Sequence, residues 1–228
     1  EDCVDDSGQA LGQISFASRW RNGNRQTSSQ GTFIMTTILA IQGDDYCAIG
    51  SDSQWTDDYN RVGKMNQPKV VSVGRYLIGV AGDTRGANVI QHAFNPPILQ
   101  PKLSGARLAK FIVSQFVPAY KECLEAHGAG RPQYDDQPAK SANEILVCAN
   151  GTIFQIDEDY GTETDTCNLY AIGSGAHFGL GALQAYTNGK RVLQANAKQM
   201  LLKSLTVSAK FDSGSGAPFH TFIQTAKP

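Results

Sequence analysis

Residues 35–40 read Met-Thr-Thr-Ile-Leu-Ala, and residues 50–53 read Gly-Ser-Asp-Ser. A threonine pair opens an apolar run that predicts a β-strand, and a carboxylate follows where a second strand would return beside the first. This pattern suits a threonine nucleophile at a new chain end. Cleavage before Thr36 would expose an α-amine with a pKa of about 7.7–8, which can take the hydroxyl proton as the oxygen attacks a carbonyl. The same letters also fit an ordinary β-strand, in which threonine is common.

The composition limits the classes of partner. The chain has 228 residues, enough for one domain with an appendage, and a formal net charge of −1. A nearly neutral chain offers no basic field, so we expect neither nucleic acid nor a membrane as partner. No apolar run is as long as a membrane span, and the opening residues lack the apolar segment of a signal peptide.

Cysteine and histidine usage gives no indication of a metal or cofactor site. The five cysteines are scattered without a Cys-x-x-Cys pair, and the four histidines lack the spacing of metal ligands. Scattered cysteines of odd number also argue against a disulfide framework and favour a reducing compartment. We therefore expect a cytoplasmic protein with no metal and no cofactor.

The chain divides into a polar leader and one folded domain. Residues 1–34 are rich in serine, glutamine, asparagine and glycine, and the periodicity changes at Phe33. Such a composition is typical of a leader or an arm. With the division placed before Thr36, residues 1–35 form the leader and residues 36–228 the domain.

Strand and helix patterns follow one another in blocks along the domain. Runs of period two predict strands, runs of period 3.6 predict helices, and Asn150-Gly151 is the strongest hairpin signal. Strands are expected at 36–42, 46–51, 69–73, 76–81, 144–149, 152–157, 169–173 and 219–224, helices at 84–94, 103–124 (kinked by Pro118), 179–187 and 195–210, and a loop at 127–142. This order predicts an α+β fold: two antiparallel sheets between two helical layers, a four-layer αββα sandwich.

Each polar motif, taken alone, has an ordinary structural explanation. Asp52 is typical of a strand-end turn, and Lys69 of the solvent face of a strand. The stretch 81–83, Ala-Gly-Asp, fits a strand-to-helix turn, although such a turn can also aim N–H groups as an oxyanion hole does. The run 172–177 begins like a dinucleotide fingerprint, but Phe178 replaces the third glycine, so nucleotide binding is rejected. No Gly-x-Ser-x-Gly elbow is present, which leaves a Ser-His-Asp hydrolase without support.

The order of the motifs resembles a known family. Six blocks follow one another as in the proteasome β-subunits, and above all as in their bacterial relatives, the HslV-type peptidases: Met-Thr-Thr-Ile-Leu-Ala, Gly-Ser-Asp-Ser-Gln-Trp-Thr, Pro-Lys-Val-Val, Ile-Gly-Val-Ala-Gly, Ala-Ile-Gly-Ser-Gly and Asp-Ser-Gly-Ser-Gly. The resemblance covers about residues 36–224. It implies the N-terminal-nucleophile hydrolase fold and a threonine endopeptidase, made as a precursor that cuts its own Met35–Thr36 bond.

The resemblance assigns chemical roles to matching residues. Thr36 corresponds to the nucleophile, with its freed amine as general base, and Asp52 to the carboxylate that orients the site. Lys69 corresponds to the lysine that lowers the pKa of the nucleophile through its opposite charge. Gly82 corresponds to the residue whose N–H stabilises the oxyanion.

Other positions correspond to groups that hold the amine or the substrate. Ser174, Asp212 and Ser215 match the residues that hydrogen-bond the amine. Thr56 matches the residue whose backbone pairs with an extended substrate, and Val80 the floor of the apolar specificity pocket. The resemblance further implies peptide or protein substrates, a homo-oligomeric ring that encloses the nucleophiles, and an ATP-driven unfoldase as a conceivable partner.

The sequence also departs from the family pattern. The segment between Asp52 and Lys69 is one residue longer than in the bacterial relatives, Asp83 stands where a second small residue is usual, and Trp55 is bulky for its position. An alternative therefore stays open: a catalytically silent subunit of the same fold, in a ring or virion-like assembly, that retains its N-terminal arm for contacts.

Overall fold

A computed structural model describes residues 33–226, apart from 58, 60 and 132–139. These residues lie in one compact unit, residues 31–228. The leader predicted at residues 1–35 falls outside the described part except for its last three residues. Within the described part, none of the helices combines the length and the apolar character that crossing a membrane requires.

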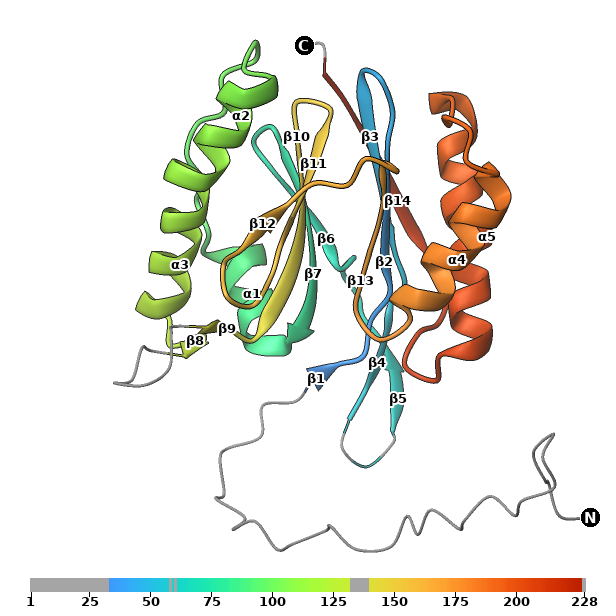
Figure 1. Ribbon diagram of the computed structural model, residues 1–228. Helices are drawn as coiled ribbons and strands as arrows, with labels where there is room; N and C mark the ends of the chain where they lie inside the picture. The colour runs from blue at the N-terminus through green and yellow to red at the C-terminus, as the bar shows by residue number, and fades with distance from the viewer. Residues whose placement is uncertain (1–32, 58, 60, 132–139, 227–228) are drawn as a thin grey trace, which may run out of the picture. The chain divides into compact units, whose positions relative to one another are not determined.

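Two antiparallel sheets form the centre of the molecule (Figure 1). The first sheet runs in the order β1 (Phe33–Ile34), β7 (Tyr76–Asp83), β10 (Asn143–Ala149), β11 (Thr152–Ile156), β12 (Thr162–Glu163), and β6 (Val70–Val73) also pairs with β7. The second runs in the order β13 (Leu169–Ile172), β2 (Ile38–Gln42), β3 (Tyr46–Ser51), β14 (His220–Thr225). Two small hairpins are separate: β4 (Gln54–Thr56) with β5 (Val62–Lys64), and β8 (Gly130–Arg131) with β9 (Lys140–Ser141).

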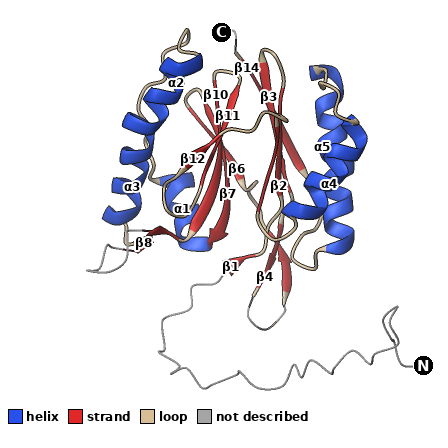
Figure 2. Cartoon of the chain, viewed as in Figure 1, coloured by secondary structure: helices blue, strands red, loops and turns tan. Residues whose placement is uncertain are grey.

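Helices cover the outer face of each sheet (Figure 2). On the first sheet lie α1 (Thr84–His92), α2 (Gly105–Phe111), the π-helix η1 (Ile112–Phe116) and α3 (Val117–Ala126), and on the second α4 (Ala176–Thr187) and α5 (Gln194–Phe211). The predicted α+β class and four-layer αββα order are therefore confirmed.

Three apolar clusters hold the four layers together. Ile78 and Phe116 belong to the cluster between the first sheet and its helices, Ile49 to the cluster between the sheets, and Leu201 to the cluster under α5. These side chains are fully buried. Burying one such side chain contributes about 1.5–3 kcal/mol, so the layers form a rigid support for the strand ends that carry the polar motifs.

A π-turn lies just before Pro118 in the long helix, where the sequence predicted a kink. The N–H of Val117 bonds the carbonyl of Ile112, five residues back, so the helix widens by one π-turn. Proline lacks an N–H and its ring would collide with the carbonyl four residues before it, at Ser114. The wider turn resolves that collision, and the helix continues to Ala126.

Two expectations need correction. The first long strand begins at Ile38 and not at Thr36, because side chains bind the backbone of the threonine pair where strand ladders would otherwise do so. The loop predicted at 127–142 contains β8 and β9 at its ends, and its middle part, 132–139, lies outside the described residues.

Candidate active site

The register of the second sheet brings distant motifs to the threonine pair. Ile38 in β2 pairs with Ser51 on one side and with Ile172 on the other. The residues that precede Ile38 therefore lie between the segment after Ser51, which begins with Asp52, and the segment after Ile172, which contains Ser174. Long-range strand pairing, and not sequence neighbourhood, assembles this site.

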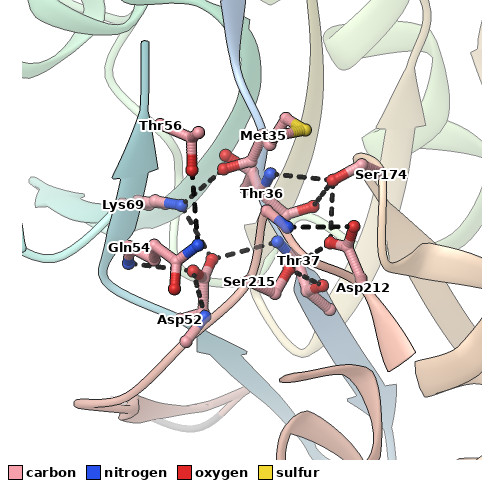
Figure 3. Close-up of polar contacts among 12 residues, drawn as sticks. Met35, Thr36, Thr37, Asp52, Gln54, Thr56, Lys69, Ser174, Asp212 and Ser215 are labelled. Carbon is pink, nitrogen blue, oxygen red and sulfur yellow. Dashed lines mark hydrogen bonds and ion pairs between the residues drawn. The ribbon is translucent and has the colours of Figure 1, made fainter. Parts of the chain in front are cut away.

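Thr36 is fully buried and bound at both of its backbone groups (Figure 3). Its N–H donates to Ser174 Oγ at 3.2 Å, and its carbonyl accepts from the N–H of Gly175 at 3.3 Å. Gly173 makes this approach feasible. Its φ is +91°, and a Cβ there would lie 2.2 Å from the carbonyl oxygen of Thr36, so a side chain at this position would push the threonine away.

Asp52 and Lys69 form a buried ion pair with Oδ1 and Nζ 2.8 Å apart. The side chains are 0% and 2% exposed. Three backbone N–H groups also donate to the carboxylate, those of Thr37 at 3.0 Å, Gln54 at 2.9 Å and Gly216 at 3.1 Å. A buried charge costs several kcal/mol unless it is paired and hydrogen-bonded, and here both conditions are met.

Lys69 also contacts the backbone just before the threonine pair. Its Nζ donates to the carbonyl oxygen of Met35 at 3.1 Å. Burial lowers the pKa of Lys69 below its ordinary value, while the charges of Asp52 and Asp212 act in the opposite direction. When protonated, the amine polarises the carbonyl of the peptide bond that joins Met35 to Thr36.

Asp212 completes a second polar group on the other side of the threonines. It directly follows the last residue of α5, where the helix dipole disfavours a carboxylate. Ser174 Oγ and Ser215 Oγ donate to its Oδ2 at 2.9 and 2.6 Å, and the N–H of Gly214 donates to Oδ1 at 3.2 Å. Ser215 Oγ also lies 2.6 Å from Thr37 Oγ1. A carboxylate at this helix end does not stabilise the helix, yet three groups donate hydrogen bonds to it. Asp212 is therefore better explained as a residue of the site than as a cap of α5.

Gly82 lies near the end of β7 with φ +119°, and a Cβ there would meet the carbonyl oxygen of Ala142 at 2.3 Å. The N–H of Val80 points to the edge of β7 that pairs with β6, and it donates to the carbonyl of Lys69. The N–H of Asp83 points to the opposite edge, on the side of β10, and it donates to the carbonyl of Ala142. Successive N–H groups of a strand alternate between its edges. The N–H of Gly82 therefore faces the edge that carries Lys69 and β1.

The end of the leader occupies this edge as an extended strand. β1 pairs antiparallel with β7, with Ile34 opposite Gly82 and Phe33 opposite Asp83. It also contacts β4, which contains Thr56. Residues 33–34 thus take the place predicted for an extended substrate, between Gly82 and Thr56.

A cavity of about 790 Å³ opens beside this strand. Its walls include Trp55, Thr56 and Val89, together with Asp83. The Asp83 carboxylate is engaged as the N-cap of α1, where it accepts the N–H of Gly86 at 3.1 Å. Val80, predicted as the floor of the specificity pocket, is 4% exposed, belongs to the apolar core, and is not among the described residues that line this cavity.

The structure brings most of the predicted site residues together. Thr36, Asp52, Lys69, Gly82, Ser174, Asp212 and Ser215 lie around the Met35–Thr36 peptide, Thr56 lies one strand away, and Val80 lies in the core. Three contributing groups were not predicted: the N–H of Thr37, the N–H of Gly216 and the side chain of Gln54. Gln54 Nε2 donates to Thr56 Oγ1 at 3.3 Å and to the carbonyl of Ser213 at 2.6 Å. Their only signal in the sequence is adjacency to predicted residues.

Comparison with known proteins finds the same fold in solved structures. BPH of Thiobacillus denitrificans matches with a TM-score of 0.66 at 21% identity, over 85% of this chain and 100% of its own. BPH in complex with epoxomicin matches at 0.65, with 20% identity over 85% and 100%. Eukaryotic HslV from Trypanosoma brucei matches at 0.59, with 21% identity over 83% and 99%. No family model and no curated protein matches the chain. The chain therefore has the fold of BPH and HslV, and its function must be argued from its site.

Proposed function

We propose that this chain is a threonine endopeptidase that first cuts its own Met35–Thr36 bond and then hydrolyses peptides with the Thr36 hydroxyl. One observation carries the proposal. The buried Lys69, paired with Asp52, donates to the carbonyl oxygen directly before Thr36, while the preceding residues lie as an extended strand against Gly82. A buried cation aimed at one peptide carbonyl is costly for folding and useful for attack on that carbonyl.

The self-cleavage step needs only groups of this site. Thr36 Oγ attacks the Met35 carbonyl carbon, and the N–H of Gly82 and Lys69 Nζ stabilise the resulting oxyanion. Thr36 Oγ gives up its proton as it attacks, that proton passes to the Thr36 nitrogen as the C–N bond breaks, and an ester between Met35 and Thr36 Oγ remains. Water hydrolyses the ester, releasing the leader with a free carboxylate and Thr36 with a free α-amine.

Turnover of peptides repeats this chemistry with the new amine as base. The amine takes the proton of Thr36 Oγ, gives it to the leaving nitrogen, and then activates water against the acyl-enzyme. Ser174, with Asp212 and Ser215 behind it, holds the nitrogen of Thr36. Lys69 keeps a positive charge beside the nucleophile, which favours the alkoxide.

The mass of the purified protein tests this function. We expect a species that begins at Thr36, shorter than the full chain by residues 1–35. It should hydrolyse small fluorogenic peptides, and the uncut chain should not, since an amide nitrogen cannot serve as base. A chain that stays full length under all conditions and turns over no peptide would overturn the proposal.

We expect cleavage after medium-sized apolar residues such as leucine and valine. The cavity beside the leader strand has apolar walls at Trp55 and Val89, and its carboxylate at Asp83 is engaged in capping α1. Apolar pockets discriminate by only about 1–3 kcal/mol per methylene, so the preference should be graded, with backbone pairing to Thr56 and Gly82 supplying most of the affinity. A peptide-library scan dominated by arginine or lysine before the cleaved bond would contradict this expectation.

We further propose a homo-oligomeric ring. Phe178, Tyr186, Leu202 and Phe211 are exposed on α4 and α5, and such apolar groups mark contact surfaces. Light scattering should give a mass several times that of one processed chain, and Phe178→Asp with Phe211→Asp should reduce it. A protein that stays monomeric at all concentrations, 24.5 kDa before the leader is removed and lighter after it, would refute the ring. An ATP-driven unfoldase partner rests on the resemblance alone.

A silent structural subunit is the second candidate. The pairing of β1 with β7 favours it, because a retained leader would fill the substrate edge and keep the Thr36 nitrogen an amide. Peptide turnover that disappears in Thr36→Ala eliminates this candidate, whereas a stable full-length assembly without turnover supports it.

A further inference from the structure

Asn143 contacts the turn that carries the proposed oxyanion donor, and it was not among the predicted site residues. It opens β10 opposite Gly82, and it is 1% exposed. Its Nδ2 donates to the carbonyl oxygen of Asp83 at 2.8 Å and to that of Ala81 at 3.4 Å. One amide group therefore binds the carbonyls on both sides of Gly82.

Peptide planarity links these contacts to the Gly82 N–H. The carbonyl of Ala81 and the N–H of Gly82 belong to one trans peptide group, so they point in opposite directions. A donor that holds the Ala81 oxygen toward β10 turns the Gly82 N–H toward the opposite edge, where Met35 and Lys69 lie. The contact with Asp83 fixes the peptide group that joins Asp83 to Thr84, and the N–H of Asp83 holds the peptide group between them through its bond to Ala142.

Glycine makes such a restraint necessary. Gly82 has φ +119°, and without a Cβ the peptide groups around it rotate at little steric cost. The conformation must then be held by hydrogen bonds. Asn143 is itself fixed, because its N–H donates to Ser141 Oγ at 2.9 Å, and Ser141 Oγ lies 3.2 Å from the hydroxyl of the buried Tyr120.

The neighbouring helix leaves space for this amide. Gly86 lies in the first turn of α1, and a Cβ there would stand 1.8 Å from Asn143 Oδ1. That oxygen is buried and has no hydrogen-bond partner among the described residues. Burying an oxygen without a hydrogen-bond partner costs free energy. This cost indicates that the role of Asn143 lies in the contacts that its Nδ2 makes with the turn.

We propose that Asn143 is a positioning residue that orients the Gly82 N–H toward the oxyanion of the reaction. This inference rests on the proposed peptidase function. Removing an oxyanion donor costs about 10²–10³-fold in kcat, and a donor that is misaligned but present should cost less, about 10–100-fold. Because the substrate edge itself stays intact, KM should change little.

The test compares Asn143→Ala with Asn150→Ala in the processed enzyme. Asn150 is a matched control, because its Nδ2 also donates to two carbonyls, those of Gln100 at 2.8 Å and Leu103 at 3.0 Å, at the far end of β10. Its φ of +48° makes alanine at least as disruptive to the fold there. We expect kcat to fall about 10–100-fold in Asn143→Ala alone, with KM within about twofold of the wild type.

A tetrahedral analogue separates orientation from general damage. A peptide boronate that adds to Thr36 Oγ should lose affinity for Asn143→Ala by the same factor as kcat, while an uncleaved peptide product binds as before. Should Asn143→Ala not fold, Asn143→Asp, which keeps the shape, is measured in its place. If the folded variant is processed too poorly for an assay of peptide turnover, the rate of self-cleavage is measured instead. The inference then predicts slower self-cleavage than in Asn150→Ala. Equal kcat and equal boronate affinity in the Asn143 and Asn150 variants would overturn the role of Asn143 and leave the proposed peptidase function standing. A wild type that neither cleaves peptides nor binds the boronate would overturn the proposed function, and the role of Asn143 with it.

Discussion

Thr36→Ala is expected to abolish both self-cleavage and peptide turnover while leaving the fold intact. The substitution removes the hydroxyl that the proposal assigns to the attack on the Met35 carbonyl, and alanine offers no other nucleophilic atom at this position. Loss of a nucleophile that acts with its base as a unit lowers the rate by at least about 10³-fold. Intact-mass analysis and a fluorogenic peptide assay measure the two effects in one preparation.

Two companion variants make this result specific. Thr36→Ser keeps a hydroxyl and should still process, at a reduced rate. Thr206→Ala removes a threonine hydroxyl from the exposed side of α5, where it bonds the carbonyl of Leu202 in its own helix, and should behave as wild type. If Thr36→Ala were processed and active like the wild type, another residue would be the nucleophile and the proposed mechanism would fail.

Lys69→Ala is expected to have the second-largest effect, on stability as well as on activity. The substitution leaves the Asp52 carboxylate buried without its cation, and breaking such a pair costs about 3–5 kcal/mol of unfolding free energy. It also removes the donor to the Met35 carbonyl, so self-cleavage and turnover should fall by at least about 10²-fold. Chemical denaturation gives the first quantity, and mass analysis with the peptide assay gives the second.

A control and a double variant separate the two consequences. Lys121→Ala breaks an exposed ion pair with Glu125 at 3.9 Å and should change stability by only about 0–1 kcal/mol. Lys69→Met combined with Asp52→Asn removes both charges, so it should be more stable than Lys69→Met alone and equally inactive. Recovery of activity along with stability in the double variant would show that the ion pair serves the fold and not the chemistry.

The local sequence determined most of the helices and long strands. Tyr46–Ser51 was predicted with its observed bounds, and the Asn150-Gly151 turn joins β10 to β11 as expected. These features depend on periodicity and turn chemistry within a few residues, which a single sequence expresses directly. The short strands β1, β4 and β5 were missed, because two or three residues carry no readable period.

The motif order predicted which residues would belong to the site, but only the tertiary structure decided how they act on one another. Asp212 is 38 residues from Ser174 and reaches it because α5 ends beside the second sheet, while Asn143 lies 60 residues from the Asp83 carbonyl that it binds. Likewise, the placement of β1 between β7 and β4 depends on an edge that only the assembled sheet offers. Composition and periodicity describe neighbours along the chain, whereas these contacts arise from strand register and from glycines at positive φ, such as Gly82 and Gly173, which let backbones approach. Thus the sequence by itself determined the layers and the candidate nucleophile, and the packing of the two sheets decided which distant groups surround Thr36.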